Sequence, residues 1–413
     1  PPRTLSVGGI IRAVYSSSNG LEKRPRLAFR NTDGSHFPCW RQTSLGCIIE
    51  PYSEKVYGEH DYEVLTSSRE GLQRQEDHFG SKQRHDTDGY NIIPFGYCTY
   101  RNRSDDGKFA FNINTISEKA IVSKFYPVFR FTNANSTFMA EFLNSSPRVK
   151  KKLSVLAVGT SQVVLSFEAL KAAKFDLPCK DEQDKIAAFL ECLNTRIENQ
   201  RTLVVALKKY KRGLLNKVFS NTDEKIYPTV YLSEVADFLQ GLTYSPSDVA
   251  NAGHLVLRSS NIQNGTLSFD DCVYVDKSIP ESLQVKCADV IMCVRNGSKS
   301  LVGKTALIPI DMPKTTWGAF MMIVRSKLND TYIFHYLNSQ MFFSQVFKDT
   351  GTATINQITK GILNECRLPL PPVEERKKIS KMLSTFDAKI YNAERTLYAL
   401  METRKALLQQ LFI

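Results

Sequence analysis

The strongest pattern along the chain is a set of apolar positions spaced alternately four and three residues apart, and it occurs in two segments. The positions that we expect to form this seam are Ile186, Leu190, Leu193, Ile197, Val204, Leu207 and Leu214 in the first segment, and Ile379, Leu383, Phe386, Ile390, Leu397, Leu400 and Leu407 in the second. A 4-3 spacing is typical of a coiled-coil seam, which is narrower than the apolar stripe of a helix on a globular core. We therefore predict two long helices, over residues 177–220 and 368–413.

The two helical segments are copies of one plan. The run "LPCKDEQDKIAAFL" aligns with "LPPVEERKKISKML" at an offset of 193 residues, and the alignment continues without a gap to Phe219 and Phe412. Each copy begins after a proline and carries acidic residues in its first turn, as the helix dipole favours. We predict a pseudo-two-fold repeat whose helices pair antiparallel, each spanning roughly 50 Å at ~1.5 Å per residue. Lys211 and Arg404 interrupt the two seams at equivalent places, and we expect them to reach out of the seam with their stems packed.

Two stretches lie outside the helices, residues 38–176 and 229–367. Both contain short alternating apolar runs, such as "AIVSKFYPVFRF" and "DVIMCVRN", broken by Gly, Asn and Asp turns. Each closes with a helix-like run, "TFMAEFLNS" or "YIFHYLNSQMFFSQVF", and a Gly-Thr loop at Gly159-Thr160 or Gly351-Thr352. We predict an α+β protein in which two globular domains alternate with two long helices that pair as an antiparallel coiled coil. The pattern assigns residues 221–228 to a linker and no role to the N-terminal segment, residues 1–37.

The charge of the chain favours a polyanionic partner. The 413 residues carry a formal net charge of +12, with an isoelectric point of about 9.1. The nine cysteines form no CxxC pair and flank no histidine at zinc-finger spacing, which favours reduced thiols over disulfides or a zinc site. No run of eighteen apolar residues and no signal peptide is present. We therefore expect a cytoplasmic protein, and the start at Pro1 without an initiator methionine suggests processing.

The run "CVRNGSKSLVGKTALI" resembles a nucleotide-binding P-loop, but its spacing does not fit. The first glycine of a P-loop would have to stand at Ser298, and Gly297 is one residue too early. The first copy contains a similar run, "YRNRSDDGKFAF". The two runs match at Arg101/Arg295, Asn102/Asn296, Ser104/Ser298, Gly107/Gly303 and Lys108/Lys304, with the second loop two residues longer. Because the loop length differs between the copies, the sequence argues against a phosphate cradle of fixed geometry.

A second apparent site is the set Asp88, Asp106 and Lys108, which resembles the D…DxK pattern of a metal-dependent nuclease. In the second copy Leu301 and Val302 occupy the interval where the aspartates should stand. The nuclease is therefore kept only as an alternative. Mg²⁺-dependent cleavage by the isolated chain, abolished by Asp106→Ala, would support it.

Both copies place Arg, Asn, Ser and Gly-Lys between two strand-like runs, which predicts a hairpin with a polar tip. Arginine can bond guanine O6 and N7, asparagine can bond adenine N6 and N7, and serine and lysine suit phosphates. The predicted DNA-binding residues are Arg101, Asn102, Arg103, Ser104, Lys108, Thr243, Tyr244, Arg258, Ser260, Asn261, Arg295, Asn296, Ser298, Lys299 and Lys304. The alternative is that these are solvated turns whose Asn and Ser side chains cap the local backbone.

In combination these features resemble the specificity subunit of type I restriction–modification systems. The resemblance rests on the repeated helices, which start "LPCKDEQ" and "LPPVEER" and end "GLLNKVF" and "ALLQQLF", alternating with two variable domains. It also rests on "PRLAF", "LSEVADFLQGLTYS" and "GTATINQITKGILNECRLPLPP". It implies that each globular domain is a target recognition domain that reads one half of a bipartite, asymmetric DNA site, and that the helices set the half-site spacing.

The resemblance also implies a non-catalytic subunit that docks two methyltransferase subunits, with restriction/translocase subunits joining the full complex on double-stranded DNA. S-adenosylmethionine, ATP and Mg²⁺ are then expected in the partner subunits, and no cofactor or metal in this chain. The sequence agrees, since it lacks the (Asn/Asp/Ser)-Pro-Pro-(Tyr/Phe) motif of adenine methyltransferases, a Gly-rich cofactor loop and a helicase Walker box. The alternatives are a protein scaffold that reads no sequence, the nuclease, and a binder of single-stranded nucleic acid.

Overall fold

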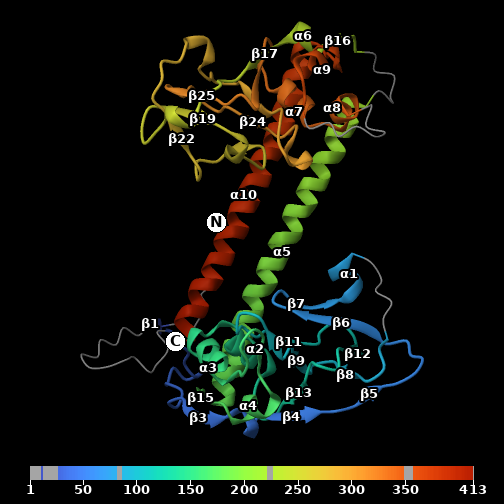
Figure 1. The fold of residues 1–413 in the computed structure, drawn as a ribbon, viewed down its shortest axis with the longest axis vertical. Helices are drawn as coiled ribbons and strands as arrows, with labels where there is room; N and C mark the ends of the chain where they lie inside the picture. The colour runs from blue at the N-terminus through green and yellow to red at the C-terminus, as the bar shows by residue number, and fades with distance from the viewer. Residues whose placement is uncertain (1–10, 13–26, 81–85, 221–226, 348–356, 413) are drawn as a thin grey trace. The chain divides into compact units, whose positions relative to one another are not determined.

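The computed structural model of the chain describes residues 11–12, 27–80, 86–220, 227–347 and 357–412. It divides into two compact units (Figure 1), unit 1 with residues 1–199 and 397–413 and unit 2 with residues 200–396. Each unit therefore combines one globular domain with parts of both long helices. The predicted Gly351-Thr352 loop and most of the predicted linker lie outside the described residues. None of the helices in the described ranges is both long and apolar enough to cross a membrane.

The two predicted long helices are confirmed as α5, Lys180–Phe219, and α10, Val373–Leu411. They begin three and five residues later than predicted. The residues before them form two short strands instead, β15 at Lys174–Leu177 and β27 at Arg367–Pro369. Prolines separate each strand from its helix, because proline has no N–H to donate inside a helix and its fixed φ suits the helix entry. Acidic residues fill both first turns, as the helix dipole favours.

Unit 1 has two main sheets, one of four strands in the order β11-β9-β13-β4 and one of five in the order β5-β8-β12-β6-β7. The strands of the first are β4 (Ile49–Tyr52), β9 (Cys98–Tyr100), β11 (Phe111–Ile113) and β13 (Val128–Phe131), and those of the second are β5 (Lys55–Val56), β6 (Glu63–Ser68), β7 (Gly71–Arg74), β8 (Tyr90–Pro94) and β12 (Lys119–Val122). The shorter strands are β1 (Ile11–Arg12), β2 (Leu27–Ala28), β3 (Arg41–Ser44), β10 (Arg103–Ser104) and β14 (Val163–Val164). The helices of this domain are α1 (Gln75–Phe79), α2 (Ser136–Ser145), α3 (Pro147–Leu156) and α4 (Phe167–Ala172).

Unit 2 has two four-stranded sheets, in the orders β17-β26-β23-β24 and β18-β22-β19-β25. The strands of the first are β17 (Ala236–Gln240), β23 (Val290–Cys293), β24 (Thr305–Leu307) and β26 (Met321–Ser326), and those of the second are β18 (Val249–Ala250), β19 (His254–Leu257), β22 (Val273–Val275) and β25 (Thr315–Trp317). The shorter strands are β16 (Thr229–Tyr231), β20 (Ile262–Gln263) and β21 (Thr266–Leu267). The helices of this domain are α6 (Leu232–Val235), α7 (Tyr332–Leu337), α8 (Gln340–Val346) and α9 (Lys360–Glu365).

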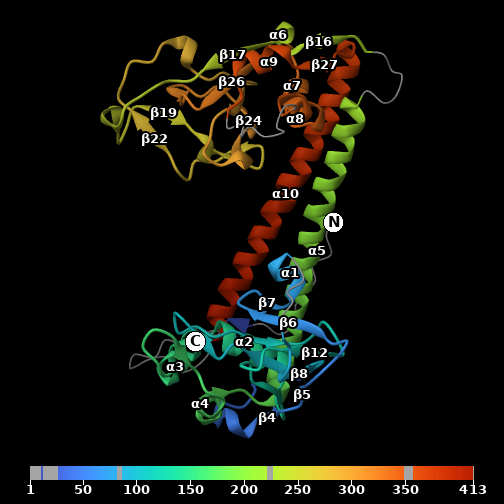
Figure 2. The ribbon, with the colours of Figure 1, turned by 45° about the vertical axis from the view of Figure 1, so that its right-hand side comes forward.

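The two globular domains share the topology of one four-stranded sheet, whereas their second sheets differ in the number and order of strands. The order β24-β23-β26-β17 in unit 2 repeats the order β11-β9-β13-β4 in unit 1. In both units the second sheet contains a parallel pair, β12 with β6 and β25 with β19. The strand before each long helix also pairs with the strand that opens its domain, β15 with β3 and β27 with β16. The predicted α+β fold with an internal repeat is therefore confirmed, and the elements of each unit can be followed in Figure 2.

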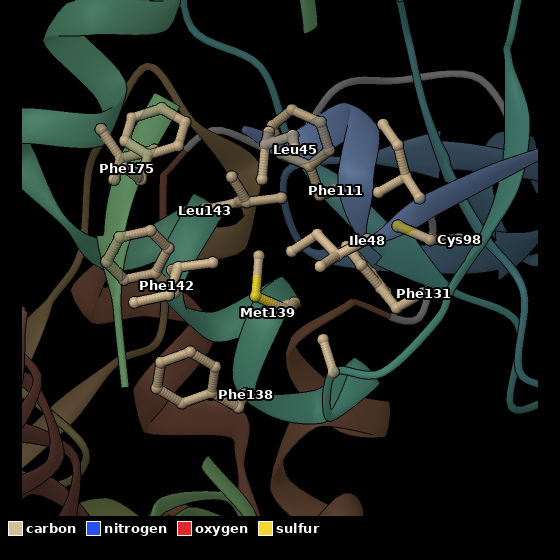
Figure 3. Packing of buried hydrophobic residues seen from close by; sticks show 14 of the residues in the cluster. Leu45, Ile48, Cys98, Phe111, Phe131, Phe138, Met139, Phe142, Leu143 and Phe175 are labelled. Carbon is tan, nitrogen blue, oxygen red and sulfur yellow. The ribbon is translucent and has the colours of Figure 1, made fainter. Parts of the chain in front are cut away.

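Each domain closes its core over one end of a long helix. In unit 1, side chains of α2 point toward the four-stranded sheet (Figure 3). Phe412, which directly follows α10, lies edge-on against Phe138 and Phe142 of α2, with ring centroids 5.7 and 5.6 Å apart. Phe219 of α5 does the same in unit 2 against two tyrosines of α7. The apolar residues that end the two helical repeats are thus part of the two domain cores.

The long helices pair antiparallel within each unit, as predicted. In unit 2 the Gln200 side-chain Nε2 donates to the Ala393 carbonyl at 2.9 Å, and Lys208 pairs with Glu394 at 2.7 Å. None of the predicted pairing residues is exposed. The expectation of a narrow seam was wrong near the helix ends, because there each helix covers its partner helix and a globular domain at once, and buries a broader stripe.

Lys211 and Arg404 do not reach out of the seam, contrary to the prediction, but form polar clusters with the neighbouring helix. Lys211 forms an ion pair with Asp387 of α10, whose carboxylate also faces Nδ1 of the buried His335 at 3.7 Å. Arg404 donates to the Asn194 side-chain oxygen of α5 at 2.6 Å and pairs with an acidic side chain of α2. Asn194 and Asp387 are 193 residues apart in the sequence, as are Lys211 and Arg404. The two clusters are therefore copies related by the internal repeat.

The helix-like run from Tyr332 to Phe347 was predicted as one piece, but it forms two helices, α7 and α8. Ser339 breaks it with an extended backbone, and its hydroxyl accepts a hydrogen bond from the Phe342 N–H at 3.2 Å. Serine at this position satisfies an N–H group that the helix itself leaves unpaired. The described part of the N-terminal segment packs on α5, where the rings of Phe29 and Phe189 lie 5.8 Å apart.

Candidate nucleic-acid interface

Both predicted hairpins are confirmed. In unit 1, β9 pairs antiparallel with β11, and in unit 2, β23 pairs antiparallel with β24. The intervening loops, residues 101–110 and 294–304, carry the predicted Arg, Asn and Ser residues. They leave the four-stranded sheets at equivalent places, because β9 and β23 have the same neighbours in the shared strand order.

The predicted residue match between the two loops was wrong by two positions. Arg103 forms a β-bridge with Val164, and Arg295 forms one with Gln357, which lies 193 residues after Val164. Arg103, rather than Arg101, is therefore the counterpart of Arg295. The place of Arg101 is taken in unit 2 by the buried Cys293. Both loops contain Arg, Asn and Ser close together, so the alignment of the sequences paired the wrong arginines. The strand register identifies the equivalent residues.

The second loop is two residues longer, as predicted. Seven residues lie between Arg103 and Phe111 at the start of β11, and nine lie between Arg295 and Thr305 at the start of β24. The matched Gly-Lys pairs are nevertheless not equivalent. Gly303-Lys304 directly precedes β24, whereas Gly107-Lys108 ends three residues before β11.

Unit 2 contains a cleft of about 740 Å³ where predicted residues converge. The predicted residues that line it are Thr243, Tyr244, Arg258, Ser260, Arg295 and Asn296. They come from three separate segments of the chain. Phe320 and Asp271 also line the cleft but were not predicted, because neither stands in a motif that singles it out. The pattern of apolar residues around Phe320 is typical of the start of any strand, so the sequence did not single this residue out.

The wall of the cleft depends on a close approach of two glycines. The Leu242 N–H donates to the Trp317 carbonyl at 2.7 Å, which brings the Gly241 backbone against Gly318. A Cβ added at Gly241 would lie 2.1 Å from the Gly318 carbonyl oxygen. Only glycine fits this position, and the contact places Thr243 at the rim of the cleft.

Arg258 and Asp271 form the polar centre of the cleft. A guanidinium nitrogen of Arg258 lies 2.7 Å from Asp271 Oδ2, and its Nε is buried without a hydrogen-bond partner. Asn261, predicted as a DNA contact, is fully buried instead. Its amide donates to the Ser268 and Asp271 carbonyls at 3.0 Å, and its oxygen accepts from the Arg258 N–H at 2.9 Å. The structure therefore assigns Asn261 to holding this loop, because its side chain has no polar group left for DNA.

The loop after β23 also lines the cleft. The Arg295 guanidinium lies over the exposed ring of Phe320, 5.2 Å from its centroid. Asn296 donates to the Ser259 hydroxyl at 3.2 Å and accepts from the Ser298 N–H at 2.9 Å. The predicted residues Ser298, Lys299 and Lys304 do not line the cleft, and of these Ser298 and Lys299 are exposed on the loop.

In unit 1 the predicted residues divide between exposed and structural positions. Arg101 is exposed, and Arg103 lies over the ring of Phe125 at 4.8 Å. Ser104 is buried, and its hydroxyl accepts from the Lys108 N–H at 3.1 Å. It was predicted as a DNA contact but holds the turn, which is the capping alternative considered for these loops. The Asn102 side-chain oxygen is buried without a partner.

The carboxylates of the nuclease alternative are engaged by protein groups. Asp106 pairs with Arg69 at 2.6 Å and with Lys108 at 3.4 Å. Slight burial alone would raise the pKa of Asp106, but hydrogen bonds from Ser104, the Lys108 N–H and Arg69 hold its pKa at about 2. Asp88 accepts from the Gly58 N–H at 2.8 Å. In the described ranges, no three His, Cys, Asp or Glu side chains are grouped so that they could hold a metal ion.

Residues 50–207 and 227–401 match the family described as type I restriction modification DNA specificity domain. Among curated proteins, 173 residues are 29% identical to the StySPI type I restriction enzyme specificity subunit of Salmonella potsdam, covering 40% of this chain and 37% of that protein. A stretch of 239 residues is 26% identical to the MjaVIII type I restriction enzyme specificity subunit of Methanocaldococcus jannaschii, covering 52% and 55%. These matches span between about a third and about half of the relatives' own lengths.

The fold is similar to that of a solved type I restriction–modification system S subunit from M. genitalium. The TM-score is 0.60 at 16% identity, over 94% of this chain and 99% of that chain. A chain from a structure describing complex assembly and conformational transition of the type I R-M system has a TM-score of 0.53 at 18% identity, over 91% and 98%. At these identities the likeness concerns the fold alone.

Proposed function

Because the chain belongs to the family of type I restriction–modification DNA specificity domains, we propose that it is the sequence-reading subunit of such a system. Each globular domain reads one half of a bipartite, asymmetric site in double-stranded DNA. The observation that carries this proposal is the cleft of unit 2, where six residues predicted from the sequence to contact DNA converge from three segments. The net charge of +12 supports a polyanionic partner.

The cleft offers groups that distinguish base pairs. A guanidinium can donate to guanine O6 and N7, a carboxylate can accept from cytosine N4, and an apolar ring can contact the thymine methyl group. Arg258, Asp271 and Tyr244 supply these three kinds of group.

The long helices set the distance between the half-sites. Two reading domains held at a defined separation gain from effective concentration, so weak half-site affinities multiply. Inserting one heptad in α5 between Ile197 and Val204, with a matching heptad in α10, is expected to change the gap and leave both half-site sequences unaltered. A methylated motif with an unchanged gap would refute this role of the helices.

We further propose that two methyltransferase subunits dock on the helices, with restriction/translocase subunits joining the full complex. Large apolar side chains are exposed along α5 and α10, which supports docking of protein partners. They include Leu203, Val205, Tyr210, Tyr391, Tyr398 and Met401. In this proposal the chain contributes recognition and no catalytic step, and the partners bring S-adenosylmethionine, ATP and Mg²⁺ in the cytoplasm.

The test is methylome sequencing of a host that carries the partner methyltransferase, with and without this chain. A motif of two short half-sites around a fixed gap, appearing only with the chain, is the expected result. A soluble complex that produces no new motif would instead favour a scaffold that reads no sequence.

A further inference from the structure

Each unit presents an exposed arginine stacked on an exposed phenylalanine. The guanidinium of Arg103 lies 4.8 Å from the ring centroid of Phe125, and that of Arg295 lies 5.2 Å from the ring centroid of Phe320. The phenylalanines are 47% and 59% exposed, and both arginines are exposed. Within the described part of the chain, neither guanidinium has an acidic partner.

The two pairs occupy the same position in the shared fold. In unit 1, Thr99 of β9 pairs with Val128 of β13, Arg103 follows four residues after Thr99, and Phe125 stands three residues before Val128.

In unit 2, Ile291 of β23 pairs with Ile323 of β26. Arg295 follows four residues after Ile291, and Phe320 stands three residues before Ile323. The two pairs therefore coincide in strand register on both of the strands that carry them.

The residues that precede the two arginines in the sequence differ between the units. The position of Arg101 in unit 1 is Cys293 in unit 2, and that of Asn102 is Val294. Core packing explains why apolar residues recur at buried positions of the repeat, but it does not explain an exposed Arg–Phe stack that recurs on two domains with different surroundings. A contact that both domains make with the same external partner explains why the pair recurs.

We propose that each Arg–Phe pair is an anchor for a DNA phosphate group, common to both domains and independent of the target sequence. This inference rests on the proposed function, in which the two domains read different half-sites. A group shared by both domains cannot distinguish the half-sites, whereas phosphate is present at every position of both. The ring holds the guanidinium over its face, and a guanidinium held in this way can still donate two hydrogen bonds to phosphate oxygens.

In unit 2 the anchor and the reading groups line the same cleft. Arg295 lies over the Phe320 ring there, and Arg258 pairs with Asp271. In this arrangement the anchor positions the backbone of the DNA, and the cleft reads the bases. Arg295 is then a positioning residue rather than a base-reading one.

The test compares Arg103→Ala and Arg295→Ala with Arg101→Ala in the full chain. Arg101 is the comparison for the anchor, because it is an exposed arginine of the same loop as Arg103 and likewise a predicted DNA contact, but it has no counterpart in unit 2. Binding to duplexes with and without the methylated motif is measured between about 50 and 200 mM salt. For both anchor variants we expect roughly fivefold to tenfold weaker binding to every duplex and a salt slope reduced by about one, with an unchanged methylated motif. Arg101→Ala should leave the salt slope closer to that of the wild type.

Several results would overturn the anchor. These are a loss confined to motif-bearing duplexes, a motif relaxed at one base pair, or losses no larger than that of Arg101→Ala. Phe125→Leu and Phe320→Leu keep the charge and the fold of these exposed loops, and should weaken binding without changing the salt slope. If the wild-type chain binds all duplexes alike and directs no motif, the proposed function fails, while uniform losses in the anchor variants would still uphold the phosphate contact.

Discussion

Replacement of Lys211 by methionine tests how the polar cluster between α5 and α10 stabilises unit 2. Lys211 is the partner of Asp387, whose carboxylate also faces the buried His335. Burial, and then the charge of Lys211, lower the pKa of His335 to about 3, so the imidazole is neutral and gives Asp387 no compensating charge at ordinary pH. Lys211→Met therefore leaves a half-buried carboxylate without its cation.

The burial of the pair sets the expected magnitude. The side chains of Lys211 and Asp387 are 15% and 35% exposed. An exposed ion pair contributes ~0–1 kcal/mol, and breaking a fully buried one costs ~3–5 kcal/mol. For this intermediate burial we expect a loss of about 2 kcal/mol in the free energy of unfolding, and a melting temperature of unit 2 lower by about 4–8 °C. Burial already raises the pKa of Asp387 and Lys211 opposes this rise, so the loss should grow as the pH rises and the carboxylate ionises.

The two tryptophans allow each unit to be followed separately. Trp317 lies in unit 2 and is fully buried, and Trp40 lies in unit 1. In a Trp40→Phe background, the fluorescence of Trp317 reports unfolding of unit 2 by urea or heat.

A double variant provides the control for the Lys211 prediction. Lys211→Met with Asp387→Leu removes both charges, so it should recover most of the stability lost in the single variant, to within ~1 kcal/mol of the wild type. A single variant as stable as the wild type, or a double variant no more stable than the single one, would refute the reasoning. Arg404→Met should destabilise unit 1, as followed by Trp40, and leave the Trp317 transition in place.

Two further predictions concern the core of unit 1. Burial raises the pKa of Glu182 to about 7, with a hydrogen bond from Trp40 opposing the rise, so the folded chain binds the proton more tightly than the unfolded chain, whose value is near 4.5. The contribution of Glu182 to stability therefore falls as the pH rises through this window. Glu182→Gln should flatten this fall and raise the free energy of unfolding at about pH 8 by up to about 3 kcal/mol. An unchanged dependence of stability on pH would contradict the prediction. Phe412→Ala removes a fully buried ring and should cost about 3–5 kcal/mol in unit 1, measured by urea unfolding, while truncation of the exposed Phe79 serves as the control that should cost far less.

The long helices and the internal repeat could be predicted from the sequence. Periodic burial along a helix is a local property, because each side chain's direction follows from its position on the same helix. The gapless offset of 193 residues likewise needed no structure, and it correctly implied an internal repeat, which the matching four-stranded sheets of the two domains confirm. The predicted starts of the two helices lay a few residues too early, because a short strand precedes each helix. The start of such a strand has no sequence signal as distinct as the proline before a helix.

The fate of individual polar residues could not be predicted. Asn261 and Ser104 stand in polar loops like the other candidates, yet the structure buries both and uses their side chains to hold the local backbone. Lys211 interrupts an apolar seam, and only the partner helix shows that Asp387 receives it. In each case the partner atom lies on a segment or turn whose position is set by folding.

The sequence alone determined the class of fold, the repeat and the two hairpins whose loops carry Arg, Asn and Ser residues, because these depend on periodicity and on composition along one segment. Tertiary structure decided that Arg103 is the counterpart of Arg295, and that Phe125 and Phe320 support them. It also decided which candidates meet in the cleft beside Asp271. The physical reason is that these relations depend on strand register, which places residues from distant parts of the chain side by side, and a shift of one residue turns a side chain to the opposite face of the sheet.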